Sequence, residues 1–152
     1  MIALDTNLLV YASRTDLPSN ERAFQLVAGL ADGTQRWAIP WPCVTEFLCV
    51  VTNRKVFTVP TPLPDALDQV EAWLEAGSLL LAETLRGWEH LKEQVTAAGL
   101  SGPGVHDARI AAICLDHEVR ELWTADRDFS KFPKLRTRNP LAEQPDEAEQ
   151  TA

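Results

Sequence analysis

The chain has 152 residues, of which 45% are hydrophobic and 24% are charged, a composition typical of one globular domain. No apolar run approaches the roughly 18 residues needed to span a membrane, and the N-terminus lacks the features of a signal peptide, so a cytoplasmic protein is expected. The net charge of −8 argues against a strongly basic nucleic-acid-binding surface, although four acidic residues among the last ten supply half of it.

Short apolar runs alternate with segments of helical periodicity along the chain. We expect strands at residues 2–4, 37–40, 79–82 and 121–124, and a weak last strand at 135–137. The expected helices are residues 20–31, 42–52, 65–76, 85–98 and 106–117. This alternation predicts an α/β fold with a parallel sheet covered on both faces. Residues 1–139 form the predicted domain, and residues 140–152 are expected to be an acidic, disordered tail.

The cysteines Cys43, Cys49 and Cys114 are odd in number, and none belongs to a C-x-x-C pair. Each lies within an apolar, helical pattern. We therefore expect three reduced, buried thiols, and neither a disulfide framework nor a zinc site.

Four carboxylates are predicted to meet at one edge of the sheet. Asp5 and Asp126 each follow a strand, and the carboxyl ends of parallel strands form the ligand-binding edge of such sheets. Helices that follow strands begin at the same edge. Asp107 lies in the first turn of its expected helix, and Glu46 lies one turn into another.

Both helical carboxylates lie on apolar faces in the sequence pattern. Asp107 shares its face with Ala111 and Cys114, and Glu46 shares its face with Cys43 and Cys49. Carboxylates are rarely buried without a partner, and no Lys or Arg lies at helical spacing beside either one. A divalent cation with oxygen ligands, Mg²⁺ or Mn²⁺, satisfies all four groups. Each acid taken alone is equally well interpreted as a turn or helix-terminus residue.

The same residues resemble a known family. The motifs are Leu4-Asp5-Thr6-Asn7 at the N-terminus, Glu46 within Pro-Cys-Val-Thr-Glu-Phe, Asp107 at the start of an apolar helix, and Thr124-Ala125-Asp126-Arg127-Asp128-Phe129 near the end. This ordered set resembles the PIN domain, and within it the VapC toxins of bacterial toxin–antitoxin systems. The resemblance covers about residues 1 to 138.

The resemblance implies a PIN-like three-layer α/β/α fold with a five-stranded parallel sheet. It implies RNA cleavage that depends on Mg²⁺ or Mn²⁺, a homodimer, and a cognate VapB-type antitoxin that blocks the site. Carried over by position, the catalytic acids are Asp5, Glu46, Asp107 and Asp126. The positions that match supporting residues are Thr6, Asn7, Thr124 and Asp128, and Asp128 matches a position that is often acidic.

A mechanism follows from such an ion, which activates a water for in-line attack on phosphorus and stabilises the leaving oxygen. Asp5, Asp107 and Asp126 are expected to bind the metal directly, and Glu46 through a water. The products would carry a 5′-phosphate and a 3′-hydroxyl. RNA also requires cations, and a basic run ends the domain: Arg127, Lys131, Lys134, Arg136 and Arg138. Charged gatekeepers on an edge strand explain this run better than RNA binding does. His106, beside Asp107, is a candidate base, but we favour its interpretation as a helix-start residue or an RNA contact.

Three alternatives remain open at this stage. One is a housekeeping PIN-domain ribonuclease without an antitoxin. Another is a phosphatase of the haloacid dehalogenase type, although that class requires D-x-D where this chain has Asp5-Thr6-Asn7. The last is a non-catalytic, Mg²⁺-binding signalling domain, which requires adjacent acids after the first strand.

Overall fold

The computed structural model describes residues 1–142. Its centre is a five-stranded sheet in the order β3-β2-β1-β4-β5, and every neighbouring pair is parallel. The strands are β1 (Ile2–Leu4), β2 (Trp37–Pro40), β3 (Leu79–Leu81), β4 (Glu121–Trp123) and β5 (Thr137–Arg138). The parallel α/β architecture predicted from the sequence is thus confirmed.

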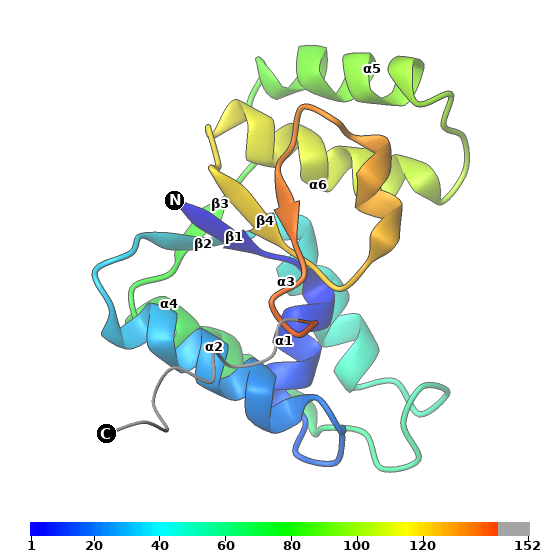
Figure 1. Ribbon diagram of the computed structural model, residues 1–152. Helices are drawn as coiled ribbons and strands as arrows, with labels where there is room; N and C mark the ends of the chain where they lie inside the picture. The colour runs from blue at the N-terminus through cyan, green and yellow to red at the C-terminus, as the bar shows by residue number, and fades with distance from the viewer. Residues whose placement is uncertain (143–152) are drawn as a thin grey trace.

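Helices cover both faces of this sheet (Figure 1). One layer contains α1 (Thr6–Ser13), α2 (Asn20–Asp32), α3 (Trp41–Val51) and α4 (Leu63–Glu75). The opposite layer contains α5 (Gly87–Ala97) and α6 (Gly104–Asp116), which pack against each other. A short 3₁₀ helix, η1 (Arg127–Lys131), follows β4.

The strand order places a crevice next to β1. The chain first moves from β1 to β2 and β3, and then returns to the other side of β1 for β4 and β5. The helices after β1 and after β4 therefore diverge to opposite sides of the sheet. Ligands of open α/β sheets bind at such a switch point, outside the carboxyl ends of the strands. Leu4 pairs with Trp123 there, so Asp5 and Thr124 come next on the two strands.

The core holds these strand ends in register. The central strands carry side chains that are fully buried, among them Ala3, Leu4, Ala38, Ile39 and Leu122. Continuous apolar runs of this kind are typical of parallel strands that are covered on both faces. A shift of one residue would turn buried positions of β1 toward the other layer, so packing fixes where Asp5 emerges.

Helix α1 was not predicted, and its sequence explains why. The segment Thr6–Ser13 lies between α2 and α3, and Leu8, Leu9 and Val10 are all buried. A helix buried on most sides has no polar stripe, so it lacks the periodicity from which helices are read. Helix α6 also begins at Gly104, two residues before the expected start.

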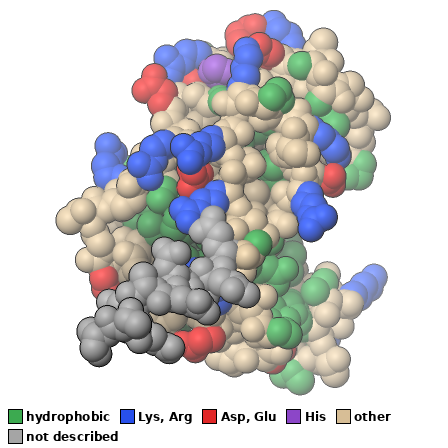
Figure 2. Space-filling model, viewed as in Figure 1, with side chains coloured by type: hydrophobic (Ala, Val, Ile, Leu, Met, Phe, Trp, Pro, Cys, Tyr) green, Lys and Arg blue, Asp and Glu red, His purple; other side chains and the backbone are tan. Residues whose placement is uncertain are grey.

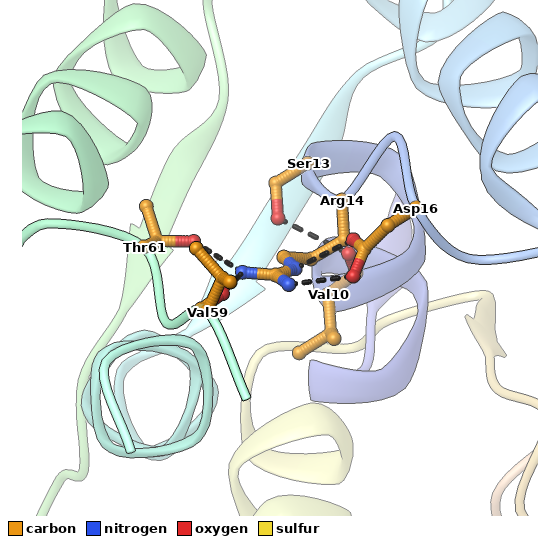
Figure 3. Close-up of polar contacts among 6 residues, drawn as sticks. All are labelled: Val10, Ser13, Arg14, Asp16, Val59 and Thr61. Carbon is orange, nitrogen blue, oxygen red and sulfur yellow. Dashed lines mark hydrogen bonds and ion pairs between the residues drawn. The ribbon is translucent and has the colours of Figure 1, made fainter. Parts of the chain in front are cut away.

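Arg14 ties the end of α1 to the loop between α3 and α4 (Figure 3). Its guanidinium donates to both carboxylate oxygens of Asp16, at 2.9 and 2.7 Å, and to the carbonyl of Val59 at 3.0 Å. A further bond reaches Thr61 Oγ1 at 3.1 Å, and the group lies 4.0 Å from the centre of the Phe57 ring. Arg14 is only 8% exposed, so these contacts replace most of its hydration.

No helix in the described part of the chain is long and apolar enough to cross a membrane. Pro140 is buried, so packing extends at least one residue beyond the expected domain boundary at residue 139. Most of the predicted acidic tail, residues 143–152, lies outside the described residues.

Candidate active site

Asp5 stands at the base of the crevice, between the end of β1 and the start of α1. It is the N-cap of α1, where its Oδ1 accepts a hydrogen bond from the Thr6 amide at 2.8 Å. Its Oδ2 accepts bonds from Asn7 Nδ2 and from Thr124 Oγ1, both at 2.7 Å. Only 4% of Asp5 is exposed. The carboxylate is therefore fixed in orientation by donors from both strand ends.

Thr124 and Asn7 join the ends of β1 and β4. The Thr124 hydroxyl donates to Asp5 and accepts from Asn7 Nδ2 at 3.1 Å and from the Asp126 amide at 3.0 Å. The side-chain oxygen of Asn7, Oδ1, accepts a bond from the Ala125 amide at 3.0 Å. The predicted supporting residues Thr124 and Asn7 thus hold Asp5 and the backbone of Asp126 at once.

Glu46 approaches the crevice from α3. Its Oε2 accepts a hydrogen bond from Thr6 Oγ1 at 2.5 Å, which links α3 to the first turn of α1. Glu46 and Cys49 are exposed, which corrects the prediction that their face of α3 is buried. The outer face of α3 forms the wall of an open cleft, and Cys43, one turn earlier, is the buried member of the group.

Three aspartates gather on the opposite side of the crevice. Asp107 lies in the first turn of α6, and Asp126 caps η1 by accepting a bond from the Asp128 amide at 2.8 Å. One carboxylate oxygen from each of Asp107, Asp126 and Asp128 lies within 4.8 Å of the others. Lys131 pairs with Asp128 at 3.0 Å on the outer side.

The acids of the predicted quartet line a single cleft of about 300 Å³. Thr6 and Asn7 line it as well, and Thr124 lies beneath them through its bond to Asp5. Asp128 borders the adjoining cavity. Among the described residues that line the cleft there is no Lys, Arg or His. Sequence reasoning found Thr6 and Asn7 of α1 but missed Val10 and Tyr11 of the same helix, which also line the cleft.

Burial and neighbouring carboxylates raise the pKa values of two acids in the site. Burial raises the pKa of Asp5 to about 6, hydrogen bonds from Thr124 and Thr6 oppose this, and the charges of Glu46 and Asp126 add to it. Burial also raises the pKa of Asp107, as do the charges of Asp126 and Asp128. Burial and like charge thus oppose ionisation of both carboxylates, and at Asp107 the charge of Lys131 offsets only part of this effect.

One buried thiol also contacts the site. Cys43 Sγ lies 3.7 Å from Asp5 Oδ1 in donor geometry, and burial together with the charge of Asp5 raises the pKa of this thiol. Cys43 and Cys114 are reduced and buried as predicted, whereas Cys49 is exposed. The spacing of Cys43 and Glu46 on α3 is the one sequence signal that associates this thiol with the site.

The donor set fits a hard divalent cation. The cleft offers the carboxylate oxygens of four acids, and no Lys, Arg or His among the described residues lines it. Mg²⁺ and Mn²⁺ prefer such oxygen ligands, and their charge would favour the ionised form of Asp5 and Asp107. Cys43 is the thiol nearest to Asp5, and burial keeps it in the neutral form.

Comparisons with known proteins agree with this architecture. A PIN domain profile matches residues 2–135. The chain is 36% identical to VapC ribonuclease Mb2897 of Mycobacterium bovis over 142 residues, which cover 93% of this chain and 96% of that protein. It is 30% identical to ribonuclease VapC33 of Mycobacterium tuberculosis, with 94% and 100% covered.

Solved structures share the fold. One is the VapBC2 complex of Rickettsia felis bound to a promoter DNA fragment, which aligns with a TM-score of 0.66 at 19% identity, covering 91% of this chain and 98% of that one. Another is FitAcB of Neisseria gonorrhoeae, with a TM-score of 0.66 at 22% identity, covering 94% and 100%. From the profile and the curated relatives, the chain belongs to the PIN-domain family and, within it, to the VapC group.

Proposed function

We propose that this protein is a divalent-metal-dependent endoribonuclease that acts as the toxin of a type II toxin–antitoxin pair. The observation that carries the proposal is the convergence of Asp5, Glu46, Asp107 and Asp126 on one cleft without a cation in its lining. Such a cleft is suited to a metal ion and a phosphodiester, and the relatives named above are ribonucleases.

Asp5, Asp107 and Asp126 are the residues that would hold the ion, with Asp128 beside them and Glu46 reaching it through a water. When bound, Mg²⁺ or Mn²⁺ lowers the pKa of a water and stabilises charge on the phosphoryl group. Thr124 and Asn7 keep Asp5 from rotating, because they saturate its Oδ2.

Glu46 is the proposed proton acceptor for the attacking water. Its Oε2 is held by Thr6, so the bond fixes the carboxylate while the side chain remains solvent-accessible. Attack on phosphorus breaks the bond to the 3′-oxygen, and the proton lost by the water is balanced by protonation of that leaving oxygen. The products are a 5′-phosphate and a 3′-hydroxyl.

We further propose an antitoxin of the VapB type, a homodimer and action in the cytoplasm. The relatives of known structure named above include the VapBC2 complex, and this supports a protein partner for the present chain. The nuclease domain is proposed to comprise the expected residues 1–139 and the buried Pro140, with the acidic segment that follows outside it.

The proposal is tested by incubating purified protein with a pool of unrelated RNAs at several Mg²⁺ and Mn²⁺ concentrations. We expect endonucleolytic cleavage that EDTA stops and that added metal restores. Ligation of adaptors that require a 5′-phosphate should capture the new ends. Metal-independent cleavage, or products with cyclic phosphate ends, would contradict the mechanism.

A further inference from the structure

A second cavity adjoins the acidic cleft. It has a volume of about 600 Å³ and lies between α3 and the start of α6, with η1 at its side. Glu46, Asp107 and Ile110 line both spaces, so the two share a wall. We call this second cavity the α3–α6 groove. Anything that extends from the cleft on this side must enter it.

The two spaces differ in charge. The lining of the cleft contains no basic side chain among the described residues, whereas the lining of the α3–α6 groove includes His106, Arg109 and Lys131. The acids Glu46, Asp107 and Asp128 line the same groove, so its lining carries both signs of charge. A polyanion held at the cleft by a metal ion would find cations on this side and none in the cleft itself.

The cations of the groove are available for a ligand. Lys131 is paired with Asp128 at 3.0 Å but is 45% exposed, and Arg109 pairs with Glu83 at 2.5 Å. Exposed pairs of this kind contribute little free energy, so either cation can turn toward a phosphate. His106 is exposed beside them, with no ion pair among the described residues. Pro103 supplies exposed apolar surface on which a base can rest.

We propose that the α3–α6 groove binds the RNA strand next to the cleaved phosphodiester, with Lys131 and His106 contacting its backbone. This inference rests on the proposed ribonuclease function and adds to it the side from which the strand leaves the cleft. Only part of the basic run at the end of the domain lines the groove. Lys131 belongs to the groove, whereas Lys134 pairs with Glu93 and Arg136 pairs with Glu121.

The first test compares Lys131→Ala and His106→Ala with Lys134→Ala. Lys134 is the matched control, because it is also an exposed lysine in an ion pair but does not line the groove. The two groove variants should raise KM about five- to tenfold, and Lys131→Ala should lower the salt dependence of binding by about one phosphate contact. Lys131→Arg should restore both, and Lys134→Ala should match the wild type.

The second test uses a thiol that the chain already has. Cys49 is exposed in the groove, whereas Cys43 and Cys114 are buried, so iodoacetamide should modify Cys49 alone in the folded protein. Excess single-stranded RNA in the presence of EDTA should slow this modification severalfold. A Cys49→Ser variant gives the background, and polyphosphate serves as a control for simple charge.

The possible results distinguish failure of the groove assignment from failure of the proposed ribonuclease function. If the wild type cleaves no RNA, the ribonuclease proposal fails and the groove assignment fails with it. If the wild type cleaves RNA, but Lys131→Ala and His106→Ala behave like Lys134→Ala and RNA leaves Cys49 unprotected, the groove assignment alone is wrong. Protection by polyphosphate equal to that by RNA would also overturn it, because charge would then suffice.

Discussion

Thr124 Oγ1 donates a 2.7 Å hydrogen bond to Asp5 Oδ2, although 119 positions separate the two residues in the chain. The bond crosses from the end of β4 to the end of β1, the two strands that border the switch point of the sheet. Its geometry depends on the register of two buried strands. The most buried catalytic candidate is therefore oriented by the core.

Replacing Thr124 by valine should lower the rate of RNA cleavage or the affinity for metal by about 10- to 100-fold. The variant keeps the shape of the side chain but removes the donor to Asp5 and the acceptor for Asn7 and for the Asp126 amide. Thr124→Ser retains the hydroxyl and should recover most of the activity. Equal activity in the Val and Ser variants would show that the hydroxyl does not position Asp5.

The pKa of Asp5 predicts how stability depends on pH without metal. The folded-state pKa is raised from 3.8 to about 6, so folding favours the protonated form. Asp5 therefore contributes stability that is fully present below about pH 4 and is lost as the pH rises through about 6. The loss amounts to about 3 kcal/mol. In EDTA, urea denaturation of the wild type should show this decline, and Asp5→Asn should lack that part of it. An identical pH dependence in the two proteins would contradict the assignment.

Metal binding should restore the folding stability that is lost when Asp5 ionises. Near neutral pH, Mg²⁺ or Mn²⁺ binds the ionised carboxylates of the folded state only, which stabilises the protein by about 2.7 kcal/mol at a hundredfold excess over Kd. Thermal unfolding should therefore shift upward with Mn²⁺ in the wild type. The shift should be much smaller in Asp126→Asn and unchanged in Asp68→Asn, whose site on α4 is exposed and distant from the cleft. Equal shifts in all three would point to a metal site elsewhere.

Arg14→Leu should destabilise the fold without changing the chemistry of the site. The substitution removes four hydrogen bonds and a cation–π contact from a nearly buried position, at a cost of about 2 kcal/mol. Arg14→Lys should recover only part of this, because lysine cannot make the paired contacts to Asp16 while also reaching Val59. Lys92→Ala, which removes an exposed pair with Glu89, should leave stability unchanged. Below its melting temperature, Arg14→Leu should cleave RNA with the same kcat as the wild type.

The sequence predicted secondary structure best where buried residues form a recognisable hydrophobic pattern. The five strands were predicted close to their observed positions because continuous apolar runs mark parallel strands, and strand ends then located Asp5 and Asp126. Helix α1 escaped prediction because it is buried on most sides. The face of Glu46 was misjudged because its neighbour Cys49 is exposed and lines the α3–α6 groove.

The contacts that finish the site depend on tertiary structure. The sequence places Thr124 and Asn7 near strand ends but does not show that they share Asp5 Oδ2. The thiol bond from Cys43 and the short link from Thr6 to Glu46 likewise depend on how α3 packs against α1. Family resemblance supplied the identity of these positions, and the structure supplies their partners.

Metal-dependent RNA cleavage by the carboxylates of the cleft is the activity that we propose. Its most direct test is a cleavage time course with purified wild type, Asp5→Asn and Asp68→Asn at saturating Mg²⁺. We expect Asp68→Asn to cleave at the wild-type rate, and Asp5→Asn to remain folded but to lose at least about a thousandfold in rate. Undiminished, Mg²⁺-dependent cleavage by folded Asp5→Asn would contradict it.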